Sequence, residues 1–127
     1  MDDYVPFELS KKLNEKGYSH DYNDFGYRLI YSDECTIKFI SDIGAYERDY
    51  YGENIPCPTI SEVLKWLRNE KKIYCLPHFE QGIDMWLFCI ERPLAGTEFA
   101  EYISESIYNT YEDATIAGIK YVLDNLI

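Results

Sequence analysis

The sequence lacks any apolar run that could cross a membrane, since about 20 consecutive apolar residues would be needed and no stretch approaches that length. The first residues, MDDYVPFEL, contain neither the basic start nor the apolar core of a signal peptide. We therefore expect a cytoplasmic protein that does not associate with membranes and whose thiols stay reduced.

Motifs for catalysis and metal binding are equally scarce. His20 and His78 are the only histidines, and no two of the 4 cysteines form a CxxC pair. The chain has no GxSxG nucleophile elbow, no DxDxDG calcium loop and no glycine-rich phosphate loop. Cys75 and Cys89 lie in apolar runs, which predicts small core residues. We expect no metal, no cofactor and no catalytic residues, so the protein is predicted not to be an enzyme.

Basic residues are few, because 12 Lys and Arg stand against 23 Asp and Glu and give a net charge of −11. Such a charge repels phosphate, so nucleic acid is a disfavoured partner. Aromatic residues are abundant at 17%, and 13 of them are Tyr, which suits half-buried surfaces and interfaces. The acidity indicates either plain solubility or a surface that docks on a basic partner or imitates nucleic acid.

The length of 127 residues predicts a single domain spanning residues 1–127. The patterns predict an α+β fold, in which helices pack on an antiparallel sheet of about 4–5 strands. The expected order is helix-strand-strand-helix-strand-strand-strand-helix, with a helix at 6–16, strands at 27–31 and 35–40, a helix from 59 to about 72, strands at 73–76, 83–91 and 102–108, and a helix from 110 onward. Residues 41–58 and 77–82 are expected as a loop and a turn.

Two of the expected helices begin with capping signatures. Thr59 is followed by Glu62, and Thr110 is followed by Asp113, so each threonine can accept a hydrogen bond from the first helical turn. In the final helix, Gly118 lies on a face of small residues with Ala114 and Ala117. This face predicts a close approach to a sheet, for which Gly118 sacrifices about 1 kcal/mol of helix propensity.

The second half of the chain carries a family resemblance. The helix ISEVLKWLR at 60–68, the KKI at 71–73 and the ending between 110 and 127 resemble a group of small uncharacterised proteins of phages and mobile elements from gut Bacteroides-type bacteria, over about residues 59–127. The resemblance implies no catalytic residues, and it implies a protein that acts on host machinery, including as an inhibitor. The order of helices and strands is also similar to double-stranded-RNA-binding domains, but the acidic final helix lacks their basic face.

An acidic stretch rich in tyrosine, without Lys or Arg, lies between Arg92 and Lys120. Because acids steer association and aromatic residues anchor interfaces, this stretch predicts a binding face for a basic protein partner, with a plain solvated edge as the alternative. The candidate binding residues are Glu98, Glu101, Tyr102, Glu105, Tyr108 and Tyr111. We therefore expect a non-enzymatic protein-interaction factor with an unidentified protein partner, and exposed tyrosines also allow a homodimer.

A basic cluster near the end of the second long helix supports an alternative function, an accessory protein that binds nucleic acid. The cluster comprises Lys65, Trp66, Arg68, Lys71 and Lys72. Cations at a helix end also suit the helix dipole, and Glu62 and Glu70 offset their charge, so a solvated helix face is the simpler interpretation.

Overall fold

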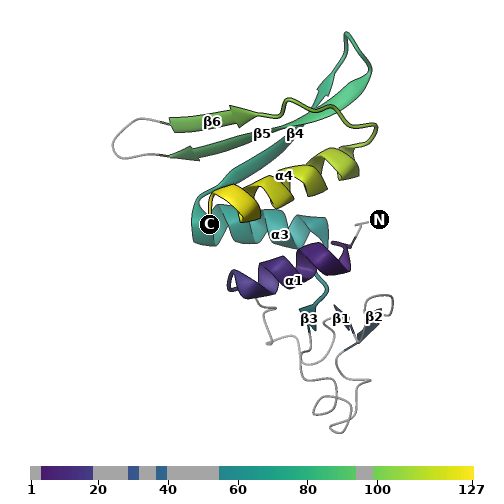
Figure 1. Ribbon diagram of the computed structural model, residues 1–127, viewed down its shortest axis with the longest axis vertical. Coiled ribbons are helices and arrows are strands. Elements are labelled where there is room, and N and C mark those ends of the chain that lie inside the picture. Colours follow the sequence, from purple (N-terminus) through teal and green to yellow (C-terminus); the bar gives the residue numbers. More distant parts are fainter. Residues whose placement is uncertain (1–3, 19–28, 32–36, 40–54, 94–98) are drawn as a thin grey trace, which may run out of the picture. The chain divides into compact units, whose positions relative to one another are not determined.

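The computed structural model describes residues 4–18, 29–31, 37–39, 55–93 and 99–127 (Figure 1). It divides the chain into two compact units, one from Tyr4 to Thr59 and the other from Ile60 to the C-terminus. The fold is α+β, as the sequence predicted. The described strands form two three-stranded antiparallel sheets, one in each unit, where one sheet of four or five strands was expected. The single domain over residues 1–127 stays a prediction.

The first unit contains one helix and a small sheet. Its elements are α1 (Phe7–Glu15), β1 (Leu29–Tyr31), β2 (Ile37–Phe39) and β3 (Ile55–Pro56). The helix and the hairpin agree with the prediction, and α1 ends before Gly17, whose positive φ of 97° is the reason for a glycine there. The strand β3 was not foreseen, because it lies within the segment expected as a loop. It pairs antiparallel with β1 and contacts α1.

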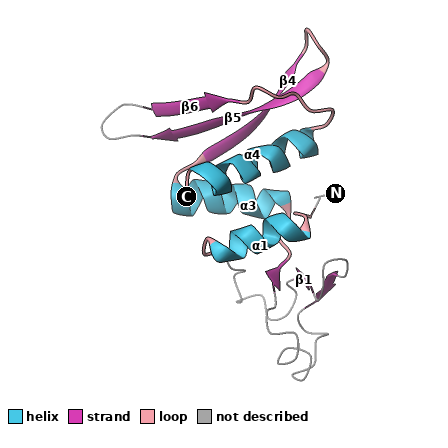
Figure 2. Ribbon diagram, viewed as in Figure 1, coloured by secondary structure: helices cyan, strands magenta, loops and turns pink. Residues whose placement is uncertain are grey.

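The second unit carries the candidate site. Its elements are α3 (Ile60–Trp66), η3 (Leu67–Lys71), β4 (Tyr74–Glu80), β5 (Met85–Pro93), β6 (Phe99–Ile103) and α4 (Tyr111–Asn125). The strands pair antiparallel in the order β4-β5-β6. The helix α4 lies along one face of this sheet, where it contacts β4 and β5, and α3 packs beside α4 (Figure 2).

The helix predicted from residue 59 to about 72 begins at Ile60 and changes its geometry in its last turn. Residues 67–71 form a wider π-helical turn, which ends at Lys72 with a left-handed φ of 57°. The backbone N–H groups of Lys72 and Ile73 both donate to the carbonyl of Leu67, which satisfies the end of the helix. Ile60, Val63 and Leu67 recur at helical spacing and are all buried.

The strand β4 continues through the residues expected to form a turn. Pro77 lies within it, opposite Phe88 of β5. The N–H and C=O groups of Phe88 both bond to Ser104 on the other side, at 3.1 and 2.9 Å. The absent N–H of Pro77 therefore removes no hydrogen bond from the sheet, and an edge strand tolerates the proline. The turn falls instead at residues 81–84.

The last strand is displaced from its expected place at 102–108. It runs over Phe99–Ile103, and pairing with β5 resumes at Tyr108, which exchanges two backbone hydrogen bonds of 2.8 and 2.7 Å with Trp86. Residues 105–107 bulge out between these two pairings, because the sequence has more residues here than β5 has opposite it. A bulge therefore interrupts the segment that was predicted to be a regular strand at 102–108.

The final helix is built as the sequence predicted. The hydroxyl of Thr110 accepts a hydrogen bond of 3.0 Å from the Asp113 N–H. Gly118 is buried against the sheet, where an added Cβ would lie 2.5 Å from Cys75 Sγ and 3.2 Å from the ring of Phe88. No helix in the described part of the chain is long and apolar enough to span a membrane.

Candidate interaction site

The predicted binding residues do not all lie together. Tyr102 faces α4 from β6, whereas Glu101, the residue before it, follows the alternation of a strand toward the opposite face of the sheet. Glu105 and Tyr108 lie in the bulged segment after β6. Tyr111 begins α4 beside a different group of aromatic residues, and Glu98 lies outside the described residues.

The centre of the site is a pair of stacked tyrosines that joins the sheet to the helix. The rings of Tyr102 on β6 and Tyr121 on α4 are nearly parallel, with an angle of 7° and centroids 4.0 Å apart. The centroid of the Phe88 ring lies 6.0 Å from that of Tyr102 and 6.1 Å from that of Tyr121. The centroid of the Tyr108 ring lies 6.2 Å from that of Phe88. Tyr121 was not among the predicted binding residues, although it lies on the small-residue face of α4 that packs on the sheet.

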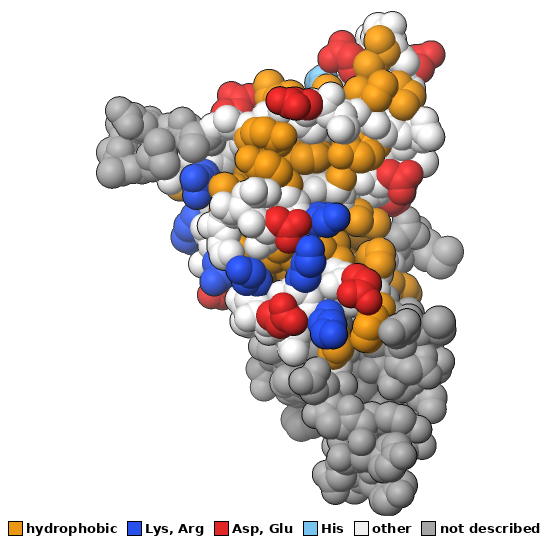
Figure 3. Space-filling view, viewed as in Figure 1, with side chains coloured by type: hydrophobic (Ala, Val, Ile, Leu, Met, Phe, Trp, Pro, Cys, Tyr) orange, Lys and Arg blue, Asp and Glu red, His pale blue; other side chains and the backbone are white. Residues whose placement is uncertain are grey.

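The stacked pair adjoins two open hollows. The larger, about 420 Å³, we call the tyrosine groove; it is lined by Phe88, Tyr102, Glu105, Tyr108, Tyr121 and Asp124, with Ser104, Ser106, Ala117, Lys120 and Asn125 completing its wall. The smaller, about 180 Å³, also adjoins the two tyrosines and is lined by Ile90, Arg92, Leu126 and the predicted binding residue Glu101. Hydrophobic side chains gather along the line where α4 meets β5 and β6 (Figure 3). Three of the six predicted residues thus meet in one groove.

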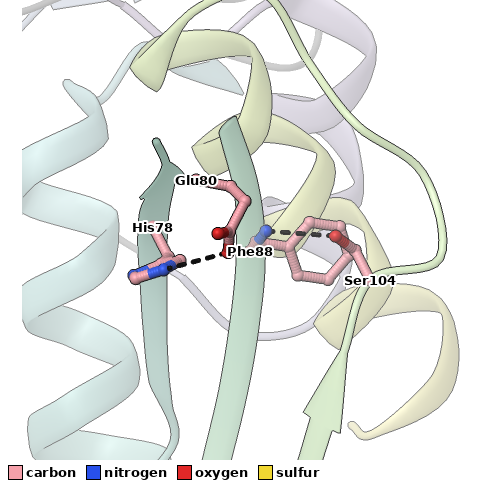
Figure 4. Close-up of polar contacts among 4 residues, drawn as sticks. All are labelled: His78, Glu80, Phe88 and Ser104. Carbon is pink, nitrogen blue, oxygen red and sulfur yellow. Dashed lines mark hydrogen bonds and ion pairs between the residues drawn. The ribbon is translucent and has the colours of Figure 1, made fainter. Parts of the chain in front are cut away.

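Ser104 fixes the segment that brings Glu105 and Tyr108 to the groove. Its hydroxyl accepts a 3.1 Å hydrogen bond from the Phe88 N–H (Figure 4). The same hydroxyl donates a hydrogen bond of 2.9 Å to the carbonyl of Ser106. The bulge is therefore tied to β5 at its start and again at Tyr108. The groove wall is held by backbone hydrogen bonds at both ends of the segment.

The groove shifts ionisation of the Tyr102 phenol to higher pH. Burial raises the pKa of Tyr102, and Tyr121, Glu105 and Tyr108 raise it further. The oxygen of a neutral phenol can accept a hydrogen bond and the Glu105 carboxylate only accepts, which suits a ligand whose N–H groups only donate. The groove can therefore hold a planar, hydrogen-bonding cation against aromatic rings, which is the chemistry of a guanidinium group.

Tyr111 belongs to a second aromatic cluster near the turn between β4 and β5. The rings of Tyr111 and Trp86 meet edge to face, with centroids 5.5 Å apart. The ring of Phe79 is tilted against the same indole, with centroids 5.3 Å apart. Phe79 and Tyr111 are 39% and 41% exposed, so this cluster remains partly open to solvent.

The basic cluster of the alternative function lies on the last turn of α3 and on η3. Its four cations are exposed and Trp66 is half-buried; the cations are Lys65, Arg68, Lys71 and Lys72. The Lys71 Nζ lies 5.5 Å from the centre of the Trp66 ring, so that face of the indole already holds a cation.

His78 lies on β4, and not in the turn where the sequence placed it. Its Nε2 is 3.6 Å from Glu80 Oε2, with side chains 58% and 50% exposed (Figure 4), so the pair contributes little to stability. Neither hollow beside the stacked tyrosines includes His78. His20 is outside the described residues, and within the described ranges no three His, Cys, Asp or Glu side chains gather as a metal site.

Comparison of the chain with protein-family models, with curated proteins and with solved structures found no match.

Proposed function

We propose that the protein is a non-enzymatic interaction factor that binds a basic protein partner through the tyrosine groove. The observation that carries this proposal is the Tyr102–Tyr121 stack, which walls an open groove with Glu105 at its side. Residues of β5, β6, the bulged segment and α4 form the groove, so its geometry is held by the fold itself.

The chemistry of the groove favours an arginine-bearing segment of the partner. A guanidinium group can lie on a tyrosine ring and pair with the carboxylate of Glu105. The net charge of −11 speeds the encounter with a basic surface. The resemblance to proteins of phages and mobile elements supports a cytoplasmic host protein as the partner. By binding such a partner, this protein would act as an inhibitor of host machinery.

Affinity capture from a bacterial lysate at low and high salt tests this function. The wild-type chain is expected to retain a basic protein at low salt and to lose it at high salt. Glu105→Lys reverses the charge in the groove and should abolish capture. Glu70→Lys makes the same charge change on the exposed turn η3, which does not line the groove. This control variant should leave capture intact.

Two outcomes would contradict the proposal. One is the absence of any retained protein at low salt. The other is equal capture by wild type, Glu105→Lys and Glu70→Lys, which would show that net charge, and not the groove, holds the partner.

The second candidate function is nucleic-acid binding at the basic cluster, which is favoured by its four exposed cations around one helix end. A gel-shift series with double-stranded and single-stranded probes decides it, because a phosphate binder weakens steeply with rising salt. Arg68→Ala should then lower both the affinity and the salt dependence. A probe that stays unshifted at low salt ends this alternative.

A further inference from the structure

The face of the β4-β5-β6 sheet opposite α4 carries an uncovered row of apolar side chains. Leu76, Cys89 and Ile103 are register partners, so they form one row across the three strands. Leu76 is 43% and Ile103 53% exposed, and Tyr74 in the neighbouring row is 41% exposed. Large apolar side chains exposed side by side on a sheet are typical of a docking surface.

Carboxylates flank this apolar row. Glu91 and Glu101 are partners in the row beside it, and Glu80 lies at the far end of β4. Burial raises the pKa of Cys89, and Glu101 and Glu91 raise it further, which agrees with both carboxylates lying on the face that Cys89 occupies. Among the described residues that alternation places on this face there is no Lys or Arg, and His78 lies there with its Nε2 3.6 Å from Glu80 Oε2.

We propose that this outer face of the sheet is a second docking surface, separate from the tyrosine groove, and that its occupant is a basic amphipathic segment of a partner protein. The apolar stripe of such a segment covers Leu76, Cys89 and Ile103, and its Lys or Arg side chains meet the flanking carboxylates. A second copy of this chain is a poorer occupant, because two such faces would bring glutamates against glutamates without a compensating cation.

This outer face is a surface separate from the tyrosine groove. The residues of the two surfaces point to opposite sides of the same strands, since Tyr102 and Ile103 are neighbours on β6. A partner could therefore engage either surface alone.

A titration with a synthetic helical peptide of leucine and lysine tests the proposal on the full chain, followed by two-dimensional amide NMR. The peptide is expected to shift the amides of Leu76, Cys89 and Ile103 and to protect Cys89 from alkylation, as read by mass spectrometry. A peptide with the same leucine stripe and glutamate in place of lysine should bind at least about tenfold more weakly, and so should a lysine–serine peptide without leucine.

Matched variants assign the binding to this face. Ile103→Gln keeps the backbone and should weaken binding about tenfold. Ile83→Gln changes an equally exposed isoleucine, 52% in the β4–β5 turn, and should leave binding unchanged. The proposal is overturned by shifts confined to the tyrosine groove, by the absence of binding, by equal effects of the two variants, or by concentration-dependent self-association through Ile103 without peptide.

Discussion

Gly118 allows α4 to lie against the sheet, because the space a side chain would need is filled by Cys75 and Phe88. At the scale of single residues, this contact and two others give direct tests. The three residues are Gly118, which is closely packed, Cys75, which is buried, and Lys72, whose backbone is left-handed.

Replacing Gly118 with alanine should destabilise the protein by up to about 2 kcal/mol, although alanine is the better helix former. The new Cβ would overlap Cys75 Sγ, and overpacking of a core costs about 1–3 kcal/mol while the gain in propensity returns about 1 kcal/mol. Urea unfolding measures the difference. Gly82→Ala is the control, because nothing lies within 4 Å of its added Cβ and stability should hardly change. A stable Gly118→Ala variant would show that α4 does not approach the sheet this closely.

The Cys75 thiol should make stability fall with rising pH. Burial, together with a smaller effect of Cys89, raises the pKa of Cys75 from 9.0 to about 12. The unfolded chain therefore ionises first, so the stabilisation is complete below pH 9 and is lost as the pH rises from 9.0 toward about 12. The free energy of unfolding should fall by up to about 1.4 kcal/mol per pH unit more in wild type than in Cys75→Ala. Parallel pH profiles of the two proteins would refute this.

Lys72 ends the helical segment in a conformation that a side chain disfavours, with φ at 57°. Lys72→Gly should raise stability by about 0.5–1 kcal/mol, because relief of left-handed strain exceeds the extra chain entropy of glycine. Lys72→Ala removes the same charge but keeps the strain, so it should give no gain in thermal unfolding. Equal behaviour of the two variants would mean that charge, and not backbone strain, matters here.

At the scale of elements, the start of α4 depends on one side chain. Thr110→Ala removes the acceptor for the Asp113 N–H and should destabilise the protein by about 1 kcal/mol. Thr110→Ser keeps the hydroxyl oxygen and should lose far less. Circular dichroism during thermal unfolding compares the three proteins, and an unchanged Thr110→Ala midpoint would argue against the cap.

The elements differed in how well the sequence predicted them. Helices were recovered because caps and apolar spacing are local signals, as at Thr110 and Gly17. The predicted bounds of β4 and β6 were wrong, and β5 runs over Met85–Pro93, two residues later than the predicted 83–91. Pro77 is typical of a turn, and β4 tolerates it only because the N–H of its register partner Phe88 bonds to Ser104 instead. The bulge at 105–107 arises because β5 has fewer residues opposite this segment. Neither fact can be seen in the local sequence.

At the scale of the whole molecule, the net charge of −11 agrees with both proposed docking surfaces, because each presents carboxylates beside apolar rings or side chains. The prediction at this scale is that removing salt strengthens partner binding at both surfaces, whereas the Ile103→Gln variant weakens only the one on the outer face. Binding measured with the two variants, Ile103→Gln and Glu105→Lys, separates the surfaces. If each variant abolished all binding, the two would be one site.

The sequence by itself determined the α+β class, the capped final helix, the close-packing Gly118 and the acidic stretch after Arg92, because composition, spacing and caps are properties of neighbouring residues. The tertiary structure decided which of those acidic and aromatic residues share a surface. Alternation along β6 sends Glu101 and Tyr102 to opposite faces, and only the packing of α4 brings Tyr121 onto Tyr102. Partners that are distant in sequence meet through strand register and helix packing, which no local pattern encodes.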